Sequence, residues 1–525
     1  MGKKKQMRSE VKGNVKNSIG RIAFAALAVL LQIGWILILM IKLYQYSSVI
    51  SLLTSLFALV VALRIYGKHT NAAFKMPWII VILAFPVFGL CIYGLFGHKE
   101  AMHKIIRKFE DVDAQLIPLN VQDETILQQL EQEDPLLANQ CHYIWKYGNY
   151  PVYDTTAVKF YPEAYLGYEE QLKELEKAKH FIFLEYHAIE EAEAFARLKD
   201  VLARKAEGVE VRILYDDVGC IGFLDKSFID RMNAIGVQCR VFNYVVPFLN
   251  IFMNNRDHRK IMVIDGKVGF TGGYNLADEY FNITHPYGYW KDTGVKLTGR
   301  AVQNFTMMFL EMWNVMGQAD TDYEKYLKAS QEGAEDGNLQ KASGYVQPYA
   351  DSPLDGEPVG ENVYLNLIKT AKKRLYVATP YLIISDEMTR ELGLAAKRGV
   401  DVRVFTPGIP DKKIIYGVTR SYYSGLVRQG VRVYEYTPGF LHAKQMLCDG
   451  DTATVGTINM DYRSLYHHFE NGVWMHGCDA IRDIEADFDK LLQDSEEVTD
   501  KYRDGRKNMA VRGWQCIMRL IAPLL

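Results

Sequence analysis

Two stretches of this sequence share one pattern, and the pattern decides the fold. The first begins at His258-Arg259-Lys260, passes through Asp265 and ends with Gly272-Gly273-Tyr274-Asn275. The second begins at His442-Ala443-Lys444, passes through Asp449 and ends with Gly456-Thr457-Ile458-Asn459. Both read H-x-K-x4-D-x6-G-x-x-N. A single histidine on a strand is more often structural, but the repetition of the whole string indicates two half-sites of one functional centre.

The spacing predicts a strand, a tight turn and a returning strand in each copy. The His and the Lys are two residues apart, so both project from the same face of a strand. An Asp-Gly pair follows, at 265–266 and at 449–450, and this dipeptide is typical of hairpin turns. The returning strand is expected to bring Asn275 and Asn459 back toward the His and Lys of their own copy.

These residue types suit phosphoryl transfer. An unperturbed imidazole has a pKa of about 6.5 and can act as nucleophile or acid near neutrality. A lysine supplies positive charge to phosphate oxygens, and an asparagine adds a hydrogen bond. One histidine can attack phosphorus to form a phosphohistidine, while the other protonates the departing alkoxide and then deprotonates the incoming hydroxyl. Lys260 and Lys444 provide the charge, so no metal and no cofactor is expected.

The surrounding sequence predicts an α/β fold in two repeated lobes. In the first half, strand-like runs at 180–189 and 209–215 flank a helix-like stretch, 191–206; in the second, runs at 374–384 and 402–405 flank 387–397. The polar stretch 318–344 separates the halves. We therefore expect a helical linker at 101–149, a first lobe at 150–317, a connector at 318–344 and a second lobe at 345–510.

Hydrophobic residues make up 49% of the chain and are unevenly spread, with long uncharged apolar runs in the first hundred positions. Uncharged runs at 22–41, 43–63 and 76–97 reach the length of about 20 residues that a helix needs to cross a bilayer. Residues 1–100 are therefore predicted to form a membrane anchor with about three transmembrane segments. A signal peptide is a weaker explanation of the first run, because further apolar runs follow it. One run could instead form an arm of a re-entrant hairpin.

The positions of the basic residues predict conflicting membrane orientations. The amino terminus is basic, which places it in the cytoplasm, and three crossings would then put the lobes outside. Basic residues after the third run, among them Lys99 and Arg107, favour the inside instead. We expect a multi-pass cell-membrane protein with cytoplasmic lobes, and the sidedness stays open. The stretch 511–525 is expected either to form an interfacial helix or to pack on the lobes. The net charge of −2 does not suggest a nucleic-acid binder.

With these motifs the chain resembles the phospholipase D superfamily, and more narrowly the bacterial cardiolipin synthases. The narrower resemblance rests on several further strings. They are Trp290-Lys291-Asp292 after the first motif, Pro438-Gly439-Phe440-Leu441 before His442, Asn459-Met460-Asp461-Tyr462-Arg463-Ser464, and Phe469-Glu470. The third apolar run, with its internal Pro86, is also similar to the membrane segment that precedes the catalytic part of that family.

The resemblance implies two α/β/α sandwich lobes around one active site. It implies condensation of two phosphatidylglycerol molecules into cardiolipin with release of glycerol, so the expected partners are phosphatidylglycerol and membrane phospholipids. By analogy, His258 is the nucleophile and His442 the acid and base. Asp265 and Asp449 are expected to support the motifs. Glu470 occupies a position that orients a motif histidine, although a surface ion pair is an alternative.

Other functions remain open at this stage. A phospholipase D hydrolase would pass the phosphatidyl group to water through the same intermediate, and a phosphatidyltransferase could use another acceptor. The motifs do not separate these reactions. A nuclease is disfavoured by the apolar runs, and a non-catalytic membrane scaffold is disfavoured by the two complete motifs.

Overall fold

The computed structural model describes residues 48–97, 102–244, 254–320, 322–328, 342–503 and 509–524, with isolated positions between 27 and 38. The chain separates into two compact units. The larger unit comprises Lys108–Phe242 and Arg256–Arg506, and it contains both motifs. The smaller unit comprises Met1–Arg107, Asn243–Asn255 and Lys507–Leu525. Most of the first apolar run and most of the connector lie outside the described residues.

The first lobe is built on a seven-stranded sheet in the order β1-β9-β7-β6-β2-β3-β4. Strands β2, β3 and β4 are parallel, and the other pairs are antiparallel. Every residue of β2 is buried, as expected for a strand covered on both faces. The strands are β1 (Thr156–Tyr161), β2 (Phe181–Tyr186), β3 (Glu210–Asp216), β4 (Gln238–Phe242), β6 (Lys260–Ile264), β7 (Val268–Gly272) and β9 (Gly294–Gly299).

The second lobe repeats this sheet strand for strand. Its order is β10-β19-β17-β16-β11-β13-β14, with β20 added at the edge. The parallel strands β11, β13 and β14 correspond to β2, β3 and β4. The strands are β10 (Tyr345–Asp351), β11 (Arg374–Ala378), β13 (Asp401–Pro407), β14 (Arg432–Tyr436), β16 (Gln445–Cys448), β17 (Thr452–Gly456), β19 (His468–His476) and β20 (Ser495–Glu497). The predicted repeat of an α/β lobe is confirmed.

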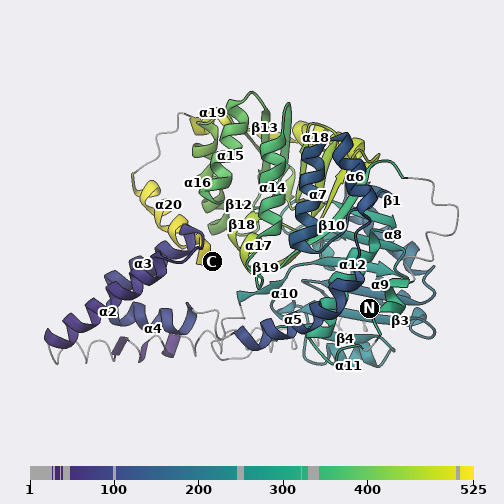
Figure 1. Cartoon of the computed structure of the whole chain (residues 1–525), viewed down its shortest axis with the longest axis horizontal. Helices are drawn as coiled ribbons and strands as arrows, with labels where there is room; N and C mark the ends of the chain where they lie inside the picture. The colour runs from purple at the N-terminus through teal and green to yellow at the C-terminus, as the bar shows by residue number, and fades with distance from the viewer. Residues whose placement is uncertain are drawn as a thin grey trace. The chain divides into compact units, whose positions relative to one another are not determined.

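Helices cover the sheets (Figure 1). Two of them pack across the boundary between the lobes. Helix α12 (Val302–Val315) contacts β10 of the second lobe, and α18 (Ala480–Gln493) contacts β1 of the first. Almost every residue of α12 is buried. The other long helices of the lobes are α8 (Ala164–Leu175), α9 (Glu193–Lys205), α14 (Val359–Thr370), α15 (Asp386–Lys397) and α16 (Lys413–Val427).

Two short parallel strand pairs also join the lobes, and they are reciprocal. Strand β5 (Arg256–Asp257) of the first lobe pairs with β19 of the second. Strand β15 (Gly439–Leu441) of the second lobe pairs with β8 (Tyr289–Lys291) of the first. Each pair ends immediately before a motif histidine. The lobes are therefore held in register at the two places where the motifs begin.

Helices precede the first lobe, over the stretch expected to be a linker. They are α5 (His103–Leu116), α6 (Glu124–Glu133) and α7 (Pro135–Gly148). Asp134 ends α6 and begins α7, where its carboxylate accepts a hydrogen bond from Leu136 N at 2.8 Å. Helix α7 contacts α14 and β10, so the linker packs on the second lobe.

The smaller unit is helical. It contains α2 (Ser48–Tyr66), α3 (Ala72–Ala84), α4 (Pro86–Phe96) and α20 (Met509–Ile521). The third apolar run is thus not one helix, because Pro86 lacks the amide hydrogen that would continue the ladder and begins a second helix instead. Helices α3 and α4 pack closely, since a Cβ added at Gly89 would lie 2.5 Å from Ile82 Cα. Among the described helices, none combines the length and the apolar character needed to cross a membrane.

Candidate active site

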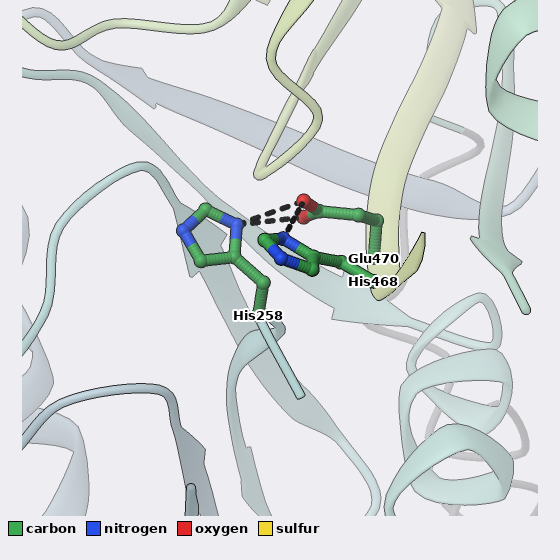
Figure 2. Close-up of side chains that lie close together, drawn as sticks. All are labelled: His258, His468 and Glu470. Carbon is green, nitrogen blue, oxygen red and sulfur yellow. Dashed lines mark hydrogen bonds and ion pairs between the residues drawn. The ribbon is translucent and has the colours of Figure 1, made fainter. Parts of the chain in front are cut away.

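The two motif histidines each bond to a carboxylate of the opposite lobe. His258 Nδ1 lies 2.8 and 3.0 Å from the two carboxylate oxygens of Glu470, which β19 carries (Figure 2). His442 Nδ1 lies 2.6 Å from Asp292 Oδ2, directly after β8. Both carboxylates are fully buried, and both imidazoles are nearly so. A carboxylate only accepts, so each Nδ1 carries a proton and each Nε2 is left to face a substrate.

The reciprocal strand pairs produce this arrangement. Asp257 pairs with Phe469, and the next residues along the two strands are His258 and Glu470. His258 N then donates to Phe469 O at 2.9 Å. In the other pair Lys291 pairs with Leu441, so Asp292 and His442 come next, and His442 N donates to Lys291 O at 2.7 Å.

Each carboxylate is fixed by its own surroundings. Thr457 and Ser464 donate their hydroxyl hydrogens to the two oxygens of Glu470. Asp292 Oδ1 accepts from Thr293 N at 2.9 Å. A Cβ added at Gly273 would lie 2.1 Å from that same oxygen, so only glycine leaves room for Asp292. Gly273 and Thr457 occupy equivalent positions in the two motifs. Thr457 donates a hydrogen bond to Glu470, and Gly273 leaves space for Asp292.

Both motif lysines lie beside the histidines. Lys260 Nζ donates to His258 O at 2.6 Å, and Lys444 Nζ donates to His442 O. Lys444 Nζ also lies 2.8 Å from His442 Nδ1. That nitrogen cannot both donate to Asp292 and accept from Lys444, and we assign its proton to the shorter bond with the carboxylate.

Burial and positive charge set the protonation of the site. Burial lowers the pKa of Lys260 to about 7 and that of Lys444 to about 8, and Lys444 further disfavours charge on Lys260. The pKa of His258 lies well below its usual value, because of burial first and then of Lys260, Lys444 and His442. The pKa of His442 is lowered by burial, Lys444 and Lys260. Each half-site thus acts electrostatically on the other, as expected for one shared centre that binds an anion.

The two motif asparagines differ in their partners. Asn275 Oδ1 accepts from Ala188 N at 3.1 Å, and its Nδ2 donates to Tyr280 O–H at 2.8 Å. Tyr280 in turn lies 5.5 Å, ring to ring, from His442. Asn459 is buried, and its Oδ1 has no hydrogen-bond partner among the described residues.

The two motif aspartates lie at the far ends of the motif strands, away from the imidazoles. Asp265 accepts from the backbone N–H groups of residues 179, 180 and 181 at 2.7–2.9 Å. Asp449 accepts from those of residues 372, 373 and 374 at 2.7–3.0 Å. Both are left-handed, with φ of 52° and 54°. They tie each hairpin turn to the start of β2 or β11, which agrees with a supporting role.

Three residues of the site were not among the sequence candidates. The sequence distinguishes Asp292 only as part of the Trp290-Lys291-Asp292 string. His187, at the end of β2, and His468, at the start of β19, lie 5.0 and 5.4 Å from the His258 ring. No motif marks these two histidines, and a tertiary contact was needed to find them.

His258, His468 and Glu470 have the donor types and the spacing of a metal site, with ligand atoms within 4.8 Å of one another (Figure 2). Their surroundings are unfavourable for a cation. Lys260 and Lys444 act on His258, and Arg463 Nε donates to His468 Nε2 at 3.4 Å. Positive charge on both sides suits a phosphate group better than a divalent metal.

Known proteins match both units of the chain. The cardiolipin synthase, phospholipase D-like domain family matches residues 172–313 and 364–492. The phospholipase D-nuclease N-terminal family matches residues 54–98. A Geobacillus sp. (strain WCH70) cardiolipin synthase is 34% identical over 482 residues, which are 91% of this chain and 94% of that protein. Cardiolipin synthase 2 of Bacillus anthracis is 33% identical over 89% of this chain and 90% of its own length.

Two further proteins also match this chain, one in sequence over most of its length and the other in fold. An uncharacterised Streptococcus mutans protein is 41% identical over 86% of this chain and 96% of its own. Among solved structures, phosphatidylserine synthase of Haemophilus influenzae Rd KW20 superposes with a TM-score of 0.53 at 14% identity. It covers 70% of this chain and 95% of its own. Because the sequence identity is low, this match supports the fold alone. The family matches and the full-length relatives together show that this chain belongs to the cardiolipin synthase family and is a phospholipase D-like phosphatidyltransferase.

Proposed function

We propose that the chain condenses two phosphatidylglycerol molecules into cardiolipin and glycerol, with His258 as nucleophile and His442 as acid and base. One observation carries the mechanism: two buried histidines in one electropositive centre, each with its Nδ1 proton held by a carboxylate of the opposite lobe. The choice of substrate is supported by the relatives that are cardiolipin synthases.

In the first half-reaction, His258 Nε2 attacks the phosphorus of one phosphatidylglycerol. The P–N bond forms while the bond from phosphorus to the glycerol oxygen breaks, and His442 gives its Nε2 proton to that oxygen. The positive charge on His258 is stabilised by Glu470. Lys260 and Lys444 stabilise the phosphate oxygens. The incoming phosphate offsets the lysine charges, which raises the pKa of His442 in the complex and allows it to act as an acid.

In the second half-reaction, a glycerol hydroxyl of a second phosphatidylglycerol loses its proton to His442. The oxygen attacks phosphorus, the P–N bond breaks, and His258 returns to its neutral form. Proton and charge balance over the cycle. We assign Asn275 and Asn459 to substrate binding. Asn275 is held in place by its hydrogen bond to Tyr280, and Asn459 Oδ1, which has no partner among the described residues, is available to accept a hydrogen bond from a glycerol hydroxyl.

We also propose that the first hundred residues attach the chain to a membrane. Helix α2 carries a set of large apolar side chains that are each more than half exposed: Leu52, Leu53, Leu56, Phe57, Val60 and Leu63. Helix α20 exposes Trp514 and Ile517, which suits an interfacial position. Fractionation of cells that express the full chain tests the attachment. Protein that stays in the high-speed supernatant would contradict it.

The reaction is tested with purified protein and phosphatidylglycerol, followed by resolution of the lipid products. Cardiolipin and glycerol in equal amounts are expected. Phosphatidic acid without cardiolipin would show the hydrolytic reaction instead. A third outcome is that cardiolipin forms only when a second, separately radiolabelled phospholipid is added and that the product carries label from both lipids. This result would show that one of the two substrates is a lipid other than phosphatidylglycerol.

A further inference from the structure

Exposed apolar side chains lie on two loops that occupy equivalent places in the two lobes. Val218 and Phe223 follow β3 of the first lobe, and they are 41% and 37% exposed. Ile409 and Ile414 follow β13 of the second lobe, and they are 40% and 63% exposed. Strands β3 and β13 correspond in the repeated sheet order. We call residues 217–226, which begin with the short helix α10 (Asp217–Cys220), and residues 408–414, which run into the first turn of α16, the mouth loops.

Both mouth loops touch the machinery around the histidines. A Cβ added at Gly219 would lie 2.0 Å from His187 O, so the first loop rests on the residue whose ring meets His258. In the second loop, Ile409 N donates to Gly439 O at 3.3 Å, three residues before His442. The loops follow the carboxyl ends of parallel strands, the edge at which α/β sheets place their ligands.

The second loop also carries positive charge close to the site. Lys412 lowers the pKa of both His258 and His442, so its ammonium lies within electrostatic reach of each. Its side chain is 69% exposed. Its ammonium lies 4.0 Å from Asp411 Oδ2, and the same carboxylate oxygen accepts the O–H of Tyr381. Lys413 and Ile414 follow and are exposed as well. Apolar tips beside exposed lysines fit a surface of anionic phospholipid.

We propose that the mouth loops seat the larger unit on the surface of an anionic lipid bilayer, with Phe223 and Ile414 inserted among the lipids and Lys412 at the headgroups. This contact rests on the proposed function, because it places the mouth of the site where phosphatidylglycerol enters. It is separate from attachment through the smaller unit. The first lobe and the second lobe each contribute one anchor, so two lipids can approach from one surface.

The first test compares two physical forms of phosphatidylglycerol in the full chain. Ile414→Asp combined with Phe223→Asp is expected to reduce cardiolipin formation at least tenfold on vesicles of phosphatidylglycerol and phosphatidylcholine. On short-chain phosphatidylglycerol dispersed below its micelle threshold, the change is expected to stay within twofold. Leu394→Asp is the matched control, because Leu394 is 44% exposed near the end of α15, which leads to the opposite edge of the sheet. Equal vesicle activity of the double variant and the control would overturn the proposal.

The second test does not depend on turnover. The Ile414→Trp variant is expected to show fluorescence quenching by vesicles with brominated acyl chains beyond that of the parent chain, whereas the Leu394→Trp variant is not. Equal quenching at both positions would overturn the docking surface. Quenching at position 414 in a protein that forms no cardiolipin from either form of substrate would instead overturn the proposed function and leave the docking surface intact.

Discussion

Glu470 of the second lobe accepts the Nδ1 proton of His258 of the first lobe at 2.8 Å, and the reciprocal bond joins Asp292 to His442. Neither lobe supplies both the histidine and the carboxylate of either pair. The half-sites suggested by the repeated motif are therefore interdependent in a specific way: each lobe supplies the group that fixes the imidazole of the other.

The carboxylates are predicted to matter for the chemical step. Glu470→Gln and Asp292→Asn keep the side-chain size but remove the charge that stabilises each imidazolium and fixes its tautomer. A decrease in kcat of about 100- to 10,000-fold is expected from each, as is typical when such an orienting carboxylate is lost. Steady-state kinetics with phosphatidylglycerol measure the effect. A rise in KM with unchanged kcat would assign these residues to substrate binding instead.

Gly273 is predicted to be intolerant of any side chain. Gly273→Ala places a methyl group against Asp292 Oδ1, so Asp292 must move and His442 loses its partner. We expect kcat to fall at least tenfold while the protein stays folded by circular dichroism. Gly425→Ala is the control, since Gly425 lies in α16 and an added Cβ there meets no atom within 4 Å. Equal activity of the two variants would contradict the role given to Gly273.

The lysines are predicted to govern activity at alkaline pH. An ammonium group is charged below its pKa and neutral above it, and the pKa values are about 7 for Lys260 and about 8 for Lys444. Rising pH through this range removes both charges from the free enzyme, so the two lysines should contribute about −2 to the limiting slope of log kcat/KM. Lys444→Arg keeps its charge and should make that slope shallower by about 1. A flat profile to pH 9 in the parent chain would exclude this role.

The motif aspartates are predicted to act on stability. Asp265→Ala removes the acceptor of three backbone N–H groups and leaves a left-handed alanine, so we expect a loss of about 2–4 kcal/mol in the free energy of unfolding. Asp265→Asn tolerates the same backbone and retains one oxygen, so its loss should be smaller. Denaturant unfolding measures both. A folded Asp265→Ala variant with full stability but no turnover would place Asp265 in the chemistry.

The repeat, the α/β lobes and the motif residues could be predicted from sequence, because they depend on local spacing and on residue types that the chemistry requires. The pairing of His258 with Glu470 and of His442 with Asp292 depends on strand pairs between the lobes, which no local pattern encodes. Asn275 is linked through Tyr280 to His442 of the other copy, and the return of Asn459 toward His442 and Lys444 stays a prediction. The aspartates of the same hairpins instead stabilise the turns through hydrogen bonds to backbone N–H groups, because the length of a strand separates them from the histidines.

The third apolar run, 76–97, does not form the single helix that its length predicted. Its length alone predicted one helix, but Pro86 divides it into α3 and α4. An 11- or 13-residue helix is about 16–20 Å long, which is shorter than the hydrocarbon core of a bilayer, about 30 Å.

The most direct test of the shared site is to trap its intermediate. The enzyme is mixed with phosphatidylglycerol in the presence of a chelator, quenched in alkali, where phosphohistidine survives, and digested for mass spectrometry. A phosphorus-linked adduct on the peptide containing His258, and absent from His258→Ala, is the predicted result. An adduct on His442 would reverse the roles of the two histidines. Full turnover by His258→Ala would contradict a single site shared by the two lobes.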